Sequence, residues 1–131
     1  TLGAGVFKMV LARSASNAST FTLSTYASVT NEISATGGYV TGGKNLVPAT
    51  GQWTVGASAK QMKFTMSTVG LAFTASGASL TNIRYAILRN STGVGAGRLL
   101  CFCQLSSSQF TVTSPNTLTV LPAATGIFTL T

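Results

Sequence analysis

Residues 83–105 read IRYAILRNSTGVGAGRLLCFCQL, and this stretch decides the fold. Two apolar runs, residues 83–89 and 98–105, flank a polar centre that contains three glycines. Strand-like runs on both sides of a glycine-rich connection are typical of a β-hairpin with a longer loop. Because both faces of each run are largely apolar, we expect the hairpin to lie mid-sheet with both faces covered. Phe102 would then be a core residue, and Phe102→Ala should cost about 3–5 kcal/mol.

Shorter runs with strand character lie on both sides of this hairpin. In residues 61–67, Met62, Phe64 and Met66 alternate with polar residues, which predicts a strand with one buried face. Comparable runs occur at residues 6–12, 45–47, 53–57, 109–113, 117–121 and 126–130, with loop or edge structure expected at 69–73 and 79–81. About eight short strands separated by turn signals indicate an all-β fold. We expect a single domain over residues 1–131, an antiparallel β-sandwich of jelly-roll-like type.

Residues 25–46 form the one long segment with little regular period. Its glycine pairs, at 37–38 and 42–43, exclude a long helix, although a single helical turn would fit at 29–33. We expect an ordered excursion over the surface, anchored by Tyr26 and Tyr39, because so long a connection is usually either functional or disordered. Glu32 should pair with a cation or cap backbone N–H groups inside it.

The composition indicates a folded, basic protein. Hydrophobic residues make up 45% of the chain and charged residues 7%, against a usual charged share of about 25%. Eight lysines and arginines face one glutamate, for a net charge of +7. This charge suits an anionic partner, although it could simply keep a free subunit soluble. The cations are scattered and not interleaved with aromatic residues, which favours an acidic protein surface over nucleic acid.

Several chemistries lack the residues they require, since the chain has no histidine, no aspartate and a single glutamate. Glycoside hydrolysis needs two carboxylates, and a serine nucleophile needs a base that an acid orients. Cys101 and Cys103 lie two apart in a predicted strand, a spacing that suits neither a mutual disulfide nor a zinc site, so we expect small buried side chains. No apolar run approaches the ~20 residues of a membrane span. We therefore expect a non-enzymatic protein with no catalytic, cofactor or metal site.

Four pieces of the chain, taken in order, resemble a known family. They are FKMVLA at 7–12, TNEISATGGYVTGG at 30–43, the hairpin at 83–105, and GIFTLT at 126–131. Together they are similar to small all-β structural proteins found in the virions of tailed bacteriophages. The second piece is the most specific, because it joins a Thr-Asn-Glu stretch to a glycine-rich excursion.

The resemblance implies a structural protein of the virion, assembled in the bacterial host cytoplasm. We expect a capsid decoration (cement) subunit that binds the major capsid protein and associates with itself as a dimer or trimer. A neck, tail or baseplate subunit is the alternative, and a carbohydrate-binding or adhesin β-sandwich is a further one, for which Trp53, Tyr26 and Tyr39 are the candidate aromatics. The residues we expect at the partner interface are Tyr26, Asn31, Glu32, Tyr39, Lys44, Lys60, Lys63, Arg84, Arg89 and Arg98.

Overall fold

The computed structural model describes residues 5–20, 22–50, 52–56, 58–93, 95–124 and 126–130, with the backbone alone for 48–50, 52, 53, 55 and 128–130. Its described residues form eleven short strands, and their only helical segment is the 3-10 turn η2 (Tyr26–Ser28). The strands are β1 (Val6–Ala12), β2 (Lys44–Thr50), β3 (Gln52–Val55), β4 (Met62–Thr65), β5 (Leu71–Thr74), β6 (Leu80–Ile83), β7 (Tyr85–Asn90), β8 (Leu99–Gln104), β9 (Phe110–Val112), β10 (Thr117–Val120) and β11 (Phe128–Leu130). The expected all-β, sandwich-like fold is confirmed.

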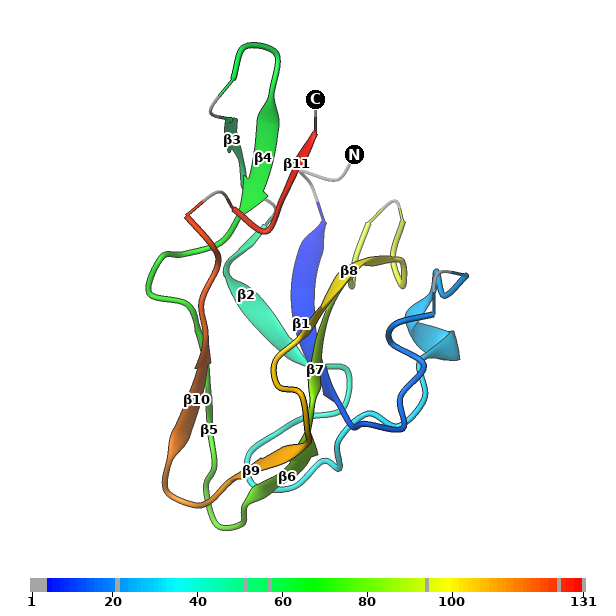
Figure 1. Cartoon of the computed structure of the whole chain (residues 1–131), viewed down its shortest axis with the longest axis vertical. Helices are drawn as coiled ribbons and strands as arrows, with labels where there is room; N and C mark the ends of the chain where they lie inside the picture. Colours follow the sequence, from blue (N-terminus) through cyan, green and yellow to red (C-terminus); the bar gives the residue numbers. More distant parts are fainter. Residues whose placement is uncertain are drawn as a thin grey trace.

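One layer of the fold is a four-stranded antiparallel sheet in the order β2-β1-β7-β8 (Figure 1). Strand β1 has the predicted bounds and lies inside the sheet, between β2 and β7. Its side chains alternate in direction, as strand geometry requires. Phe7, Met9 and Leu11 enter one hydrophobic cluster, whereas Val10 and Ala12 enter another on the opposite face.

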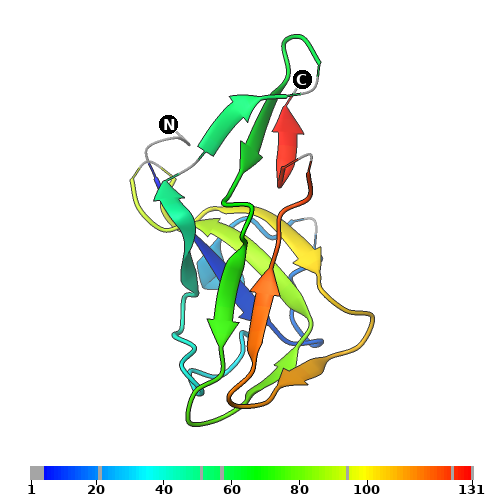
Figure 2. The same cartoon turned by 90° about the vertical axis from the view of Figure 1, so that its left-hand side faces the viewer.

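The second layer is a long antiparallel ribbon built from two strand pairs in succession. β4 pairs with β11 and β5 pairs with β10, and the chain runs directly from β4 to β5 and from β10 to β11 (Figure 2). β3 adds a third strand at the free side of β4. The strand pairing of the ribbon is interrupted between the two pairs. There, residues 66–70 connect β4 to β5, and residues 121–127 connect β10 to β11.

The main core lies between the sheet and the ribbon. Phe7 from β1 and Phe64 from β4 are both fully buried, with ring centroids 5.0 Å apart in an edge-to-face arrangement. Leu71 and Phe73 from β5 join the same cluster. The short β6–β9 pair lies at the end of the sandwich opposite β3 (Figure 1).

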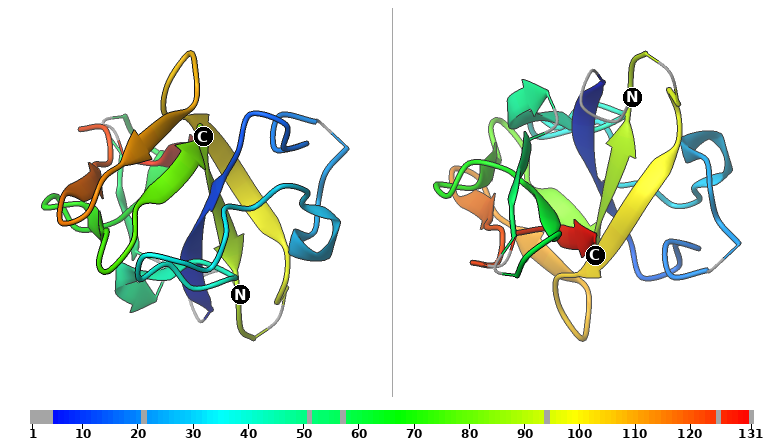
Figure 3. Two further views of the ribbon diagram at one scale, coloured as in Figure 1. Left: turned by 90° about the horizontal axis from the view of Figure 1, so that it is seen from below. Right: turned by 90° about the horizontal axis from the view of Figure 1, so that it is seen from above.

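The loop after β1 and the start of the excursion lie over the outer face of the sheet (Figure 3), whereas the later part of the excursion turns to the ribbon side, where Ile33 and Tyr39 enter the main core. Tyr26 and Val29 pack there against a second cluster that includes Tyr85 and Ile87 of β7. Both faces of β7 are therefore covered, as expected for the first strand of the hairpin. The excursion's one helical turn lies at residues 26–28 and not at 29–33, because Glu32 forms a β-bridge with Ala12 and the residues on either side of it are hydrogen-bonded to the end of β1 and to Arg13.

The second strand of the hairpin does not lie mid-sheet, which corrects the prediction. β8 is an edge strand of the four-stranded sheet, and Phe102 is 44% exposed. Phe102→Ala is therefore not a core deletion, and its cost should fall well below the 3–5 kcal/mol expected of one. Met62, expected to face inward, is 42% exposed. The expected loop or edge regions at 69–73 and 79–81 overlap β5 and β6, each in a two-stranded pair, and Ile83, expected to begin the hairpin, ends β6 instead.

Candidate functional site

The only acidic side chain of the protein is held against the end of β1. Strand β2 begins beside β1 at the Lys44–Met9 pair, and beyond that point residues 31–33 take its place. Ile33 N donates to Leu11 O (3.0 Å), and Arg13 N donates to Asn31 O (2.9 Å). These backbone bonds hold the part of the excursion that carries Glu32 beside the sheet.

The carboxylate of Glu32 accepts three hydrogen bonds. Its donors are the hydroxyls of Tyr26 (2.6 Å) and Tyr39 (2.7 Å) and the backbone N–H of Gly42 (2.8 Å). The Tyr39 hydroxyl in turn accepts the N–H of Leu11 (3.1 Å). Of the two roles expected for Glu32, the cap on backbone N–H groups is therefore confirmed, and both expected tyrosine anchors meet at it.

Arg89 of β7 closes this group from the sheet side. Its guanidinium lies 3.9 Å from the centroid of the Tyr26 ring, and its Nε donates to Gly42 O (3.0 Å). The next residue, Gly43, has a φ of +87°, and a Cβ there would lie 2.2 Å from Met9 O. Only glycine permits so close a backbone approach at positive φ. We call Tyr26, Glu32, Tyr39, Gly42 and Arg89 the Glu32 cluster.

The Glu32 cluster raises the pKa values of its two tyrosines above that of an ordinary tyrosine. Burial, followed by the hydrogen bond to Glu32, raises the pKa of Tyr26 to about 12, and the same two causes raise the pKa of Tyr39 further. Both hydroxyls therefore stay protonated at neutral pH and serve as donors. The three donors come from residues 26, 39 and 42, so the carboxylate ties separate parts of the excursion together.

An alkaline titration should detect this anchor. Because the folded pKa of Tyr26 lies above the ordinary 10 of the unfolded chain, its stabilising contribution is complete below pH 10 and is lost as the pH rises through about 12. Tyrosinate absorbance should show Tyr26 and Tyr39 ionising late. Tyr39→Phe should remove the latest component, and an unchanged titration curve in that variant would contradict the assignment.

The other residues expected at the interface do not form one patch. Arg84 and Arg98 lie at opposite ends of the β7–β8 hairpin, since Arg84 bonds to Leu105 through the backbone and Arg98 bonds to Asn90. Arg84 also lies 5.4 Å from the Tyr85 ring centroid. Arg98 is exposed.

The remaining expected residues are spread over other elements. Lys60 is exposed in the β3–β4 turn, and Lys63 of β4 is half-buried beside Gly126. Asn31 is exposed at a φ of +54°, and its amide donates to Ala15 O (2.9 Å). The structure thus brings together Tyr26, Glu32, Tyr39 and Arg89, and Lys44 borders a pocket that Tyr39 also lines.

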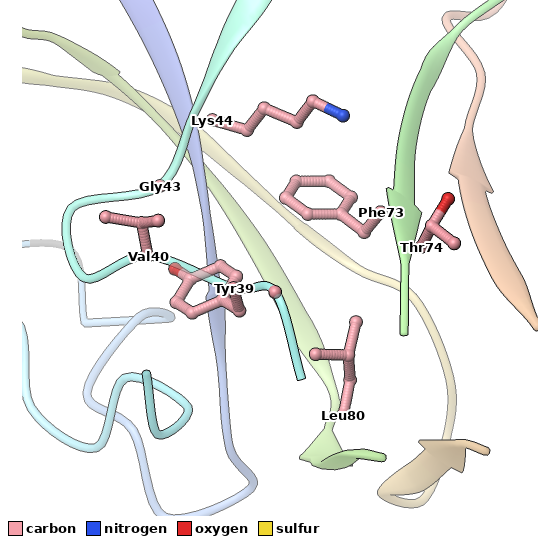
Figure 4. Close-up of a pocket in the computed structure, with 8 residues that line it drawn as sticks. Tyr39, Val40, Gly43, Lys44, Phe73, Thr74 and Leu80 are labelled. Atoms are coloured by element: carbon pink, nitrogen blue, oxygen red, sulfur yellow. The ribbon is translucent and has the colours of Figure 1, made fainter. Parts of the chain in front are cut away.

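A pocket of about 320 Å³ lies between the excursion and β5 (Figure 4). Lys44 extends across it above Phe73, 5.9 Å from the ring centroid, and its ammonium group donates to Ala72 O. The hydroxyl of Tyr39, which also lines the pocket, is bonded to Glu32. Ligand pockets depend on a few well-placed polar groups. Here the Lys44 ammonium and the Tyr39 hydroxyl are already hydrogen-bonded within the protein.

Cys101 and Cys103 are free, and Cys103 is exposed at the edge strand β8, which corrects the expectation that both are buried. Cys103 is exposed, whereas burial raises the pKa of Cys101 to about 11. The described residues contain no cluster of three or more potential metal ligands, and none of their helices could span a membrane. The side chain of Trp53, a candidate for sugar binding, lies outside the described residues.

Comparison of the chain with protein-family models, curated proteins and solved structures finds no match.

Proposed function

We propose that this chain is a non-enzymatic structural subunit of a bacteriophage virion, a decoration subunit that binds and stabilises the lattice of the major capsid protein. The observation that carries the proposal is the internal use of Glu32. Its carboxylate is occupied by Tyr26, Tyr39 and Gly42, so the single acid of a +7 chain is committed to holding the excursion. The virion setting of this proposal rests on the resemblance to phage virion proteins that the sequence of residues 30–43 led us to expect.

The cations of the subunit supply the attraction to the lattice. Lys60 and Arg98 are exposed and lie on separate turns, so they can reach different acidic groups of a repeating surface. Arg84 and Arg89 were expected beside them, but each is half-buried over a tyrosine ring of this chain. We therefore assign lattice contact to Lys60 and Arg98 first, and to Lys63 of β4 second.

Attachment to empty capsids tests this proposal. Binding of the purified subunit should weaken as salt rises, because exposed ion pairs are screened. Lys60→Gln with Arg98→Gln should weaken binding roughly 3- to 10-fold, the size expected of two exposed pairs. Lys8→Gln with Arg13→Gln removes the same charge from cations outside the expected interface and is the matched control. Salt-independent attachment, or equal loss in both double variants, would contradict docking through these two cations.

The same assay separates the alternatives. Attachment to tail tubes or baseplates in place of capsids would assign the subunit to the neck, tail or baseplate. Binding to a glycan array without capsid attachment would favour an adhesin. The structure lends that last function little support, because Tyr39 is buried and Tyr26 lies beneath the guanidinium of Arg89.

A further inference from the structure

Four of the five sulfur-bearing side chains of this protein line one pocket. The pocket has a volume of about 290 Å³ and lies between the four-stranded sheet and the connection from β10 to β11. The four are Met9, Met66, Cys101 and Cys103, whereas Met62 is exposed on β4 and does not line it. The other described residues of the lining are all apolar. Sulfur atoms are therefore the side-chain donors that this pocket offers to a ligand.

The two thiols project from the same face of β8, because side chains two apart on a strand share a face. Cys101 is paired across the sheet with Leu88, and Cys103 with Ala86; both partners also line the pocket. Cys101 is half-buried, whereas Cys103 is exposed. A ligand can thus enter from solvent past Cys103 and reach Cys101 behind it.

The spacing of the thiols suits an ion between them better than a bond between them. Cα atoms two apart on a strand lie about 6.5–7 Å apart, and parallel side chains at that separation do not reach the roughly 2 Å between the sulfur atoms of a disulfide. Two metal–sulfur bonds of about 2.3 Å each, placed in line, span about 4.6 Å. A small lean of the two thiols toward one another provides that distance.

The two methionines bring thioethers to the same pocket from the two layers of the sandwich. Met9 belongs to β1 and is 7% exposed, and Met66 follows β4 and is 3% exposed. The clusters noted above as absent from the described residues are those of histidine, cysteine and carboxylate ligands, and thioethers extend that donor set. Thiolates and thioethers are soft donors, the type that Cu(I) prefers.

We propose that Cys101 and Cys103 bind one Cu(I) ion between their sulfur atoms, with a thioether of the same pocket as the additional donor. Binding releases the two thiol protons and leaves the oxidation states of copper and sulfur unchanged. This site goes beyond the proposed structural function and does not depend on it, so capsid attachment and copper binding can succeed or fail separately.

Charge and ligand number favour Cu(I) over zinc at this place. Two thiolates and one Cu(I) leave a single negative charge, and the net charge of +7 on the chain favours an anionic centre. A structural zinc site takes four ligands from cysteine, histidine and carboxylate groups. The described lining of the pocket supplies two of these, namely the two cysteines.

Anaerobic titration of the reduced protein with Cu(I), supplied as its acetonitrile complex in competition with the chelator bicinchoninate, tests the site. The wild type should take up one equivalent per chain with no change in sedimentation. Cys101→Ser and Cys103→Ser should each weaken binding by more than the roughly 10- to 100-fold that loss of a ligand's hydrogen-bond partner costs. Met62→Leu is the matched control and should bind like the wild type.

Three results of this titration would overturn the proposal. The first is a wild-type protein that takes no Cu(I) from the chelator. The second is full affinity in either serine variant, because a single thiol would then suffice. The third is uptake of half an equivalent together with dimer formation, because the ion would then join the exposed Cys103 residues of two chains.

The thioether donor has a test of its own. Met9→Leu with Met66→Leu nearly conserves the volume of the core, and it should weaken Cu(I) binding roughly tenfold while the one-to-one stoichiometry stays. X-ray absorption of the copper-loaded wild type should show sulfur neighbours only. Unchanged affinity in the double variant would overturn the role of the thioethers. Nitrogen or oxygen neighbours, or Zn(II) binding as tight as that of Cu(I), would overturn the site itself.

Discussion

Phe64→Ala should lower the free energy of unfolding by about 3–5 kcal/mol, as deletion of a buried aromatic ring does. Phe64 is fully buried, and its ring meets that of Phe7 at 5.0 Å between centroids. This pair joins the ribbon to the four-stranded sheet, so the cavity left by the variant would lie between the two layers. Urea denaturation should show the loss, and the melting temperature should fall by roughly 10–15 °C.

Met62→Ala is the matched control, since Met62 lies two residues away on the same strand but is 42% exposed. Its cost should stay below about 2 kcal/mol, because 42% of the residue is already exposed and less apolar surface is lost from the interior. Equal losses in the two variants would mean that the ribbon does not pack on the sheet through Phe64.

The periodicity of hydrophobic residues predicted where most strands lie in the sequence, but not which strands pair with one another in the sheets. Residues 6–12 alternate clearly and form β1 with those bounds. β7 and β8 are both apolar on two faces, yet one lies inside the sheet and the other at its edge. Coverage of a strand is decided by segments distant in sequence, which periodicity does not report. Phe102 was therefore expected in the core for a sound local reason and is nevertheless exposed.

The candidate site was predictable in part. A single acid in a segment with two tyrosines indicated an internal role, and Glu32 does bond to Tyr26, Tyr39 and Gly42. Arg89 was expected at a partner surface, because nothing local places the end of β7 beside residue 42. The stacking of its guanidinium on Tyr26 depends on a chain separation of 63 residues. Contacts of that kind require the fold to be known.

Glu32→Ala should cost about 3 kcal/mol of stability. The change leaves the buried Tyr39 hydroxyl and the Gly42 N–H without their acceptor, and each unsatisfied buried group costs about 1–3 kcal/mol. Glu32→Gln keeps one acceptor oxygen for these two donors and should cost about 1 kcal/mol. Thermal melts and urea denaturation of the three proteins would measure the series.

Hydrogen exchange can distinguish this loss from that of Phe64→Ala. The Glu32 cluster ties the excursion to the sheet, so Glu32→Ala should expose the amides of residues 26–44 before those of β1 and β7, because regions open in separate units. Thr41→Ala, beside Gly42 but exposed, should leave both stability and exchange unchanged. If Glu32→Ala behaved like Thr41→Ala, the excursion would be held by its apolar contacts with β7, and the single carboxylate would have no anchoring role.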